Sequence, residues 1–101
     1  MPFQLDSLMY YTYVLQSDRD RKWYTGATAN LKSRVNEHEH GRVRSTRARG
    51  PFRLIYYEAC LEPGDAYRRE RYLKTGRGKR YLKQRLATWL REASSNKLER
   101  H

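Results

Sequence analysis

The segment that most constrains the fold is residues 10–38, which joins two aromatic, β-like stretches to a helical one. Residues 9–15 are rich in aromatic and β-branched side chains, a composition typical of a strand. A charged turn follows, and the same composition resumes at residues 23–25. Two such stretches on either side of a short polar turn predict an antiparallel hairpin, with Gly26 closing its second strand.

Three further elements follow the hairpin. Asn30 is a suitable N-cap for a helix of about residues 31–40, and Gly41 is a stop signal after it. Residues 42–51 contain four arginines and no acidic residue and end in Gly-Pro, so they predict a basic loop. Residues 52–60 regain the β-like composition and predict a third strand.

The helix at residues 31–40 presents two different faces. Leu31 and Val35 are one turn apart and are expected to face the sheet. Arg34 and His38 form the adjacent row at the same spacing, so their side chains lie next to each other. The helix therefore offers one apolar face for packing and one polar pair for chemistry.

Two helices are expected in the last third of the chain. Pro63 is a typical first helical residue, and the helix that it opens should reach about residue 74. Gly76 and Gly78 are expected to break this helix. A last helix is predicted over residues 79–92, because its apolar residues recur at helical spacing.

The order of these elements predicts an α+β fold, with a small three-stranded, mainly antiparallel sheet flanked by about three helices. A chain of 101 residues is expected to hold one domain, because two cores of half that size would each lie close to the lower limit of stability. We place this domain at residues 9–93, between a lead-in at residues 1–8 and a polar tail at residues 94–101.

The net charge of +11 is the strongest indication of the partner. Clustered Lys and Arg side chains displace counterions from a phosphate backbone, so nucleic acid is expected. A membrane is disfavoured because no long helix joins a bulky apolar face to a basic one. The alternative is that the basic surface only keeps the protein in solution. A single cysteine excludes an intrachain disulfide, and without a signal-like apolar run at the N-terminus we expect a cytoplasmic protein.

Two short motifs in the hairpin resemble those of the GIY-YIG nuclease family, in particular its small stand-alone members, which are similar to the N-terminal domain of an excision nuclease. The first motif of that family ends in a tyrosine, which Tyr13 matches, although Tyr11 stands where glycine is usual and Thr12 where isoleucine is usual. The second motif is a Tyr-x-Gly, which Tyr24 and Gly26 match at the expected separation. The resemblance implies the α+β nuclease fold.

The resemblance covers roughly residues 10–86 and includes three further residues. The family places an arginine and then, in many members, a histidine one turn later on the following helix, and Arg34 and His38 fit both positions. The metal-binding glutamate of the family lies on a later helix, and Glu70 occupies a similar segment. The resemblance thus implies a metal-dependent endonuclease that hydrolyses phosphodiester bonds in DNA with one Mg²⁺ or Mn²⁺ ion.

Each of these residues suits a role in that chemistry. Glu70, on the inward stripe of its helix, suits a hard cation, and the alternative is a structural ion pair with the arginines around it. Arg34 suits the non-bridging oxygens of the phosphate. Tyr13 or Tyr24 suits the attacking water and its proton if metal and arginine lower the pKa of the phenol; the alternative is that both are core residues. His38 has three open roles: to relay a proton, to hold a tyrosine hydroxyl, or to bond a backbone carbonyl.

Basic side chains beyond this set are expected to follow a nucleic-acid backbone without reading its sequence. They are Arg42, Arg44, Arg47, Arg49, Arg68, Arg69, Arg71, Lys74, Arg77, Lys79 and Arg80. DNA is favoured over RNA, a protein partner is allowed, and the oligomeric state stays open. The alternative to an enzyme is a non-catalytic DNA- or RNA-binding module that kept the nuclease fold. A remoter alternative is a basic interaction protein whose motif tyrosines are purely structural.

Overall fold

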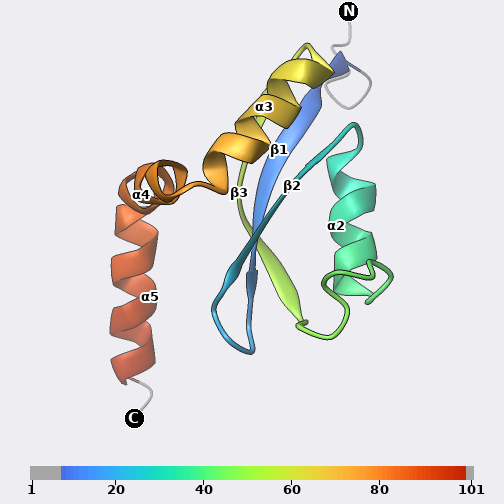
Figure 1. Cartoon of the computed structure of the whole chain (residues 1–101). Helices are drawn as coiled ribbons and strands as arrows, with labels where there is room; N and C mark the ends of the chain where they lie inside the picture. Colours follow the sequence, from blue (N-terminus) through green and yellow to red (C-terminus); the bar gives the residue numbers. More distant parts are fainter. Residues whose placement is uncertain (1–7, 100–101) are drawn as a thin grey trace, which may run out of the picture. The chain divides into compact units, whose positions relative to one another are not determined.

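The computed structural model describes the backbone of residues 8–99 and the side chains of residues 8–94. The predicted lead-in, apart from Leu8, and the last two residues of the predicted tail lie outside the described residues. The elements follow in the order β1 (Tyr10–Ser17), β2 (Trp23–Thr28), α2 (Leu31–Glu39), β3 (Phe52–Cys60), α3 (Pro63–Leu73), α4 (Gly76–Arg85) and α5 (Ala87–Glu99). Figure 1 shows this arrangement.

The sheet has three strands in the order β2-β1-β3, and both pairings are antiparallel. The hairpin register sets Tyr13 opposite Gly26, and a register shift interrupts the β1–β3 pairing between Val14 and Leu15. The predicted α+β fold with a three-stranded antiparallel sheet is confirmed. As the central strand, β1 is buried along nearly its whole length.

Helix α2 covers one face of the sheet, as Figure 1 shows. Its N-cap is Asn30, whose side chain accepts a hydrogen bond from the Ser33 backbone N–H. Leu31 and Val35 pack against the buried core cluster, so the predicted inward face of this helix is confirmed. That cluster consists of Tyr13, Leu15 and Phe52.

The first turns of α3 lie along β1, where Thr12 Oγ1 donates a hydrogen bond of 2.9 Å to the Ala66 carbonyl oxygen. The hydroxyl of Thr12 is buried, and this bond gives its proton an acceptor. Thr12 belongs to the β1 face opposite the one that carries Tyr13, because alternate residues of a strand point to opposite sides. Strand β1 is therefore packed from both sides.

Two sequence-based predictions about glycines are wrong. Strand β2 continues to Thr28, so Gly26 lies within the strand and does not close it. The helix that Pro63 opens ends at Leu73, close to the predicted residue 74, but Gly76 and Gly78 do not break it, because both belong to the next helix, α4. The Thr75 side chain caps α4 by accepting from the Gly78 N–H at 3.1 Å. A Cβ on Gly78 would come within 2.7 Å of the Tyr72 carbonyl carbon. Glycine at this position permits a close backbone approach.

The prediction of a single last helix over residues 79–92 is wrong, because this part of the chain forms two helices with other bounds. The chain forms α4 and then α5, which continues through residues 94–96, where the sequence suggested the start of a polar tail. The described residues therefore contain four helices, α2 to α5, where the sequence predicted about three, because the last predicted helix is two. Hydrophobic spacing alone did not show the interruption near Leu86, the C-cap of α4.

The chain divides into two compact units, Met1–Glu70 and Arg71–His101. The sheet, α2 and the first part of α3 belong to the first unit. In the part of the chain that the structure describes, no helix has the length and apolar character needed to cross a membrane.

Candidate active site

Tyr13 lies in the middle of β1, and its side chain is buried at 1% exposure. Its ring lies across Gly26, the residue opposite on β2. A Cβ built on Gly26 would approach Tyr13 Cζ to 2.6 Å, and the hydroxyl oxygen still more closely. The glycine of the second motif is thus needed because the tyrosine of the first motif fills the space that its side chain would take.

His38 lies next to the hydroxyl of this tyrosine. It is 2% exposed, and its Nε2 is 3.0 Å from Tyr13 Oη. Its Nδ1 is 2.8 Å from Thr46 Oγ1. Aromatic rings surround the imidazole, with ring-centroid distances of 5.8 Å to Tyr13, 5.1 Å to Tyr24 and 6.3 Å to Phe52. Burial, and after it the charge of Arg34, lower the pKa of His38 below its usual value of 6.5, so the ring is neutral at pH 7.

Arg34 lies one turn before His38 on α2. Its guanidinium interacts electrostatically with the Tyr13 hydroxyl, and its Nη1 is 3.1 Å from Glu37 Oε1. Burial lowers the pKa of Arg34, but the bonds to Glu37 and Tyr13 outweigh it and leave the pKa above its ordinary value. This arginine is therefore a fixed positive charge between a phenol and a carboxylate.

The environment of Tyr13 raises the pKa of its hydroxyl to about 12. Burial is the main cause, the bond from Arg34 acts against it, and the charges of Tyr24 and Glu70 add to the increase. The sequence-based hypothesis of a general base assumed a lowered pKa beside metal and arginine. In the protein alone the direction is the opposite, and the phenol is protonated at neutral pH.

Glu70 projects from α3, is half-buried, and is close enough for its charge to act on the Tyr13 phenol. No group of three or more His, Cys, Asp or Glu that could hold a metal occurs among the described residues. Mg²⁺ commonly takes only one or two protein carboxylates and completes its shell with water and substrate oxygens. A single carboxylate such as Glu70 fits an ion bound in that way, and does not fit a metal held by a cage of protein ligands.

All five predicted site residues lie in the first unit. Tyr13 and Tyr24 contact His38, Arg34 lies one turn before His38 on the same helix, and the charge of Glu70 acts on the Tyr13 phenol. The site is built from β1, β2, α2 and α3. Each element supplies one or two of the side chains.

The sequence-based prediction did not include two residues that form hydrogen bonds to site residues, Glu37 and Thr46. Glu37 follows Arg34 at a spacing of three residues on one helix, and that spacing was a usable signal for the ion pair. Thr46 is fully buried and contacts His38, but it lies in the segment that the sequence marks as a basic loop. No local pattern distinguishes it from the exposed residues around it.

The basic segment between α2 and β3 is anchored as well as charged. Val43 and Thr46 are buried, whereas Arg42, Arg44 and Arg47 are exposed. Backbone bonds close turns in this segment, among them the one from Arg47 N to the Val43 carbonyl oxygen at 2.9 Å. The segment therefore holds these three arginines toward solvent, whereas Arg49 is half-buried, with its guanidinium over the Phe52 ring.

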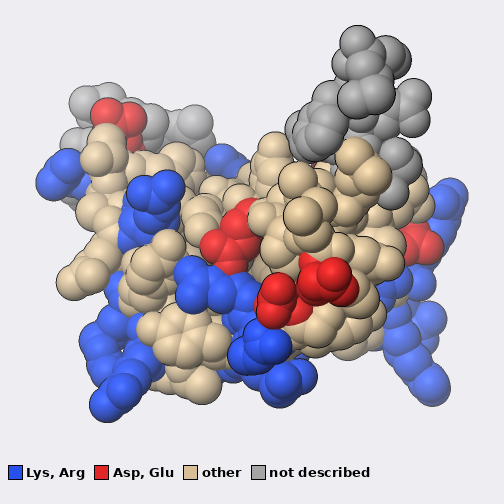
Figure 2. Space-filling model, turned by 90° about the horizontal axis from the view of Figure 1, so that it is seen from above, with Lys and Arg blue, Asp and Glu red and all other residues tan. Residues whose placement is uncertain are grey.

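The other predicted nucleic-acid contacts are divided between the two units. In the first unit, Arg68 pairs with Asp65 at 2.8 Å, and Arg69 forms an ion pair with Glu58. The remaining five belong to the second unit; they are Arg71, Lys74, Arg77, Lys79 and Arg80. On the face drawn in Figure 2, basic side chains are spread around the surface with the fewer acidic ones between them.

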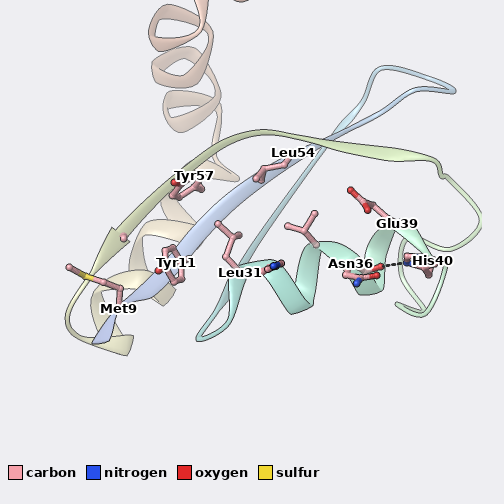
Figure 3. Close-up of a pocket in the computed structure, with 11 residues that line it drawn as sticks. Met9, Tyr11, Leu31, Asn36, Glu39, His40, Leu54 and Tyr57 are labelled. Atoms are coloured by element: carbon pink, nitrogen blue, oxygen red, sulfur yellow. Dashed lines mark hydrogen bonds between the residues drawn. The ribbon is translucent and has the colours of Figure 1, made fainter. Parts of the chain in front are cut away.

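A pocket of about 590 Å³ lies between α2 and the sheet, away from this cluster. Leu31 from α2 and Tyr11 and Leu54 from the sheet point into it, as Figure 3 shows. Asn36 and His40 lie at its α2 side, where His40 Nδ1 bonds the Asn36 carbonyl oxygen at 2.8 Å. None of the five predicted site residues belongs to the described residues that line this pocket.

Comparison with known proteins places the chain in a class. Residues 9–84 match the family described as the GIY-YIG catalytic domain. The chain belongs to the GIY-YIG family, which is a family of nucleases, and the resemblance of its motifs is confirmed. Nucleases of this family generally use a divalent metal.

The particular relatives are small proteins. The chain is 40% identical over 67 residues to the UPF0213 protein CPE1444 of Clostridium perfringens, an alignment that covers 65% of this chain and 71% of the relative. It is 38% identical over 66 residues to the UPF0213 protein OB0043 of Oceanobacillus iheyensis, covering 64% and 76%. A solution NMR structure of the UPF0213 protein BH0048 from Bacillus halodurans is similar at 36% identity and a TM-score of 0.47, covering 73% of this chain and 81% of that one.

Proposed function

We propose that this protein is a divalent-metal-dependent endonuclease that hydrolyses phosphodiester bonds in DNA. One observation carries the proposal: a buried tyrosine hydroxyl is bonded to a neutral histidine, and the charges of an arginine and a glutamate act on the same hydroxyl. Phosphodiester hydrolysis needs a proton acceptor for the attacking water, a positive charge on the phosphate and a ligand for a hard cation. The cluster supplies a candidate for each.

The proton path starts at Tyr13. Its pKa of about 12 keeps the phenol protonated at neutral pH, so it has no free base to offer by itself, but Nε2 of a neutral His38 lies 3.0 Å from its hydroxyl oxygen. The phenol accepts a proton from water while it passes its own proton to the imidazole. Tyr24, whose ring faces His38, is suited to orient the water. In this arrangement no phenolate has to exist before the substrate binds.

Arg34 and a metal ion held by Glu70 are proposed to neutralise the charge of the phosphate. Arg34 lies one turn before His38 on α2 and interacts with the Tyr13 hydroxyl, and its guanidinium would bind the non-bridging oxygens where the transition state is most anionic. Glu70 would hold the Mg²⁺ or Mn²⁺ ion. When bound there, such an ion stabilises the developing charge and the leaving oxygen.

Binding to DNA is proposed to depend on the exposed arginines of the basic segment and on the cations of α3 and α4. Contacts of this kind neutralise phosphates and position the backbone without sequence preference. The net charge of +11 supports this part of the proposal.

The test compares wild type with Glu70→Ala on supercoiled, single-stranded and branched DNA, with Mg²⁺ or Mn²⁺ and with chelator. Glu62→Ala is the matched control, since Glu62 is an exposed acid just before α3. We expect cleavage by wild type and by Glu62→Ala in the presence of metal, and its loss in Glu70→Ala and with chelator. Unchanged cleavage by Glu70→Ala would show that the metal ligand is wrongly assigned.

The second candidate function is a non-catalytic nucleic-acid-binding module, which the net charge supports equally well. It is distinguished by the same samples. If wild type cleaves none of the substrates with either metal, yet binds DNA with an affinity that falls steeply as salt is added, the binding module is the correct function.

A further inference from the structure

A threonine outside the recognised motifs completes the hydrogen-bond chain at the site. Thr46 is 0% exposed, and its Oγ1 lies 2.8 Å from Nδ1 of His38. The other ring nitrogen of His38 lies 3.0 Å from the Tyr13 hydroxyl oxygen. The Thr46 hydroxyl lies 3.5 Å from the Val43 carbonyl oxygen. The imidazole is thus held at both nitrogens by side chains from two different segments.

The direction of these bonds follows from counting protons. A neutral imidazole carries one N–H, so one ring nitrogen donates and the other accepts. The buried Tyr13 hydroxyl also has one proton to place, and Nε2 of His38 lies 3.0 Å from its oxygen. With the proton on Nδ1, His38 donates to Thr46, the threonine proton points to the Val43 carbonyl, and Tyr13 donates to Nε2. Every proton of the chain then has an acceptor.

In the opposite tautomer, one buried proton has no hydrogen-bond acceptor. With the proton on Nε2, the Tyr13 oxygen would accept from His38, and its own buried proton would lack an acceptor among the hydrogen bonds of the described residues. A buried donor without a partner is costly. The geometry therefore favours the Nδ1–H form.

We propose that Thr46 is a positioning residue that holds His38 in the Nδ1–H tautomer, so that Nε2 is free to accept the proton of Tyr13. The catalytic half of this inference rests on the proposed nuclease function, whereas the tautomer itself does not. Thr46 belongs to the arginine-bearing segment between α2 and β3, and its bond to His38 also ties that segment to the site.

Two variants distinguish the effect of losing the Thr46 hydroxyl from the effect of changing the volume of its side chain. Thr46→Val keeps the shape and removes the hydroxyl, whereas Thr46→Ser keeps the hydroxyl and removes a methyl group. Ser45→Ala, at an exposed neighbouring position, is the control. Long-range ¹H–¹⁵N NMR of the full chain reads the tautomer of His38, with its signals assigned by comparison with His40→Gln and His101→Gln.

We expect an Nδ1–H imidazole in wild type, Thr46→Ser and Ser45→Ala, and a mixture of tautomers in Thr46→Val. In DNA cleavage, kcat of Thr46→Val should fall roughly 10- to 100-fold, because a buried bonding partner is lost, while KM for DNA is unchanged. Thr46→Ser should keep the wild-type kcat, which a purely space-filling role would not predict.

An Nε2–H imidazole in wild type overturns the inference, and this measurement decides it even if Thr46→Val fails to fold. So does a Thr46→Val variant that keeps both the tautomer and the rate, or a Thr46→Ser variant as slow as Thr46→Val. If wild type cleaves no DNA, the proposed function fails, but the tautomer measurement still decides the role of Thr46.

Discussion

The contact between Tyr13 and Gly26 can be tested by adding one methyl group. In Gly26→Ala the new Cβ would stand 2.6 Å from Tyr13 Cζ and closer still to the hydroxyl oxygen. The backbone is not the obstacle, because Gly26 is not among the positive-φ residues. The ring has to move, and it is buried and bonded to His38.

The expected cost can be added from its parts. Forcing an extra carbon into a packed core costs about 1–3 kcal/mol. Moving the phenol away from His38 Nε2 forfeits a hydrogen bond worth about 1 kcal/mol. Replacing glycine restricts the unfolded chain and returns about 0.4–1 kcal/mol. The net loss of folding free energy is therefore roughly 2 kcal/mol, a large part of the stability of a domain of this size.

Urea unfolding of single and double variants measures this loss. Gly64→Ala is the matched control, since a Cβ there meets nothing within 4 Å and Gly64 lies in the first turn of α3, where alanine should be neutral or stabilising. Tyr13→Leu removes both clashing atoms, so Gly26→Ala should cost little in that background. Tyr13→Phe removes only the oxygen, so the cost should largely remain.

Two results would refute the reasoning. One is a Gly26→Ala variant as stable as wild type. The other is the same cost in the wild-type and Tyr13→Leu backgrounds, because a coupling energy near zero means that the two side chains do not share the space.

Further predictions concern pH, the phosphate contact and salt. Because burial lowers the pKa of His38, the unfolded chain binds a proton at this residue more tightly than the folded chain does. The free energy of unfolding should therefore fall as the pH drops below 6.5. Urea titrations should show a weaker pH dependence for His38→Asn. The pKa of Tyr13, raised from 10.0 to about 12, has the opposite sign: stability should fall by about 3 kcal/mol as pH rises through that interval, and Tyr13→Phe should remove the loss. Arg34→Lys loses the planar fork, and single-turnover cleavage should slow roughly tenfold or more, whereas an unchanged rate would contradict the phosphate contact. Arg44→Ala and Arg47→Ala should each lower the slope of log affinity against log salt by about 1, with no change in base preference; an unchanged slope would place these side chains off the DNA.

Local sequence determined much of the fold. The third strand, Phe52–Cys60, has the predicted bounds, and Asn30 caps α2 as expected. The inward face of α2 was also predictable, because Leu31 and Val35 recur at the helical period. These features depend on residues close together in the chain, so they can be predicted from composition, capping residues and hydrophobic periodicity. The spacing of the tyrosines, the arginine and the glutamate was enough to indicate the family.

Only the tertiary structure shows how the side chains of the candidate site are arranged and protonated. The need for Gly26 arises from a ring on the opposite strand, and the burial of Thr46 arises from a histidine eight residues away on another element. The pKa of Tyr13 depends on how deeply β1 is buried between α2 and α3, which outweighs the bond from Arg34. Each of these depends on groups that only folding brings together. The residue types therefore indicate the candidate site residues, whereas the three-dimensional packing determines which of those groups carry protons.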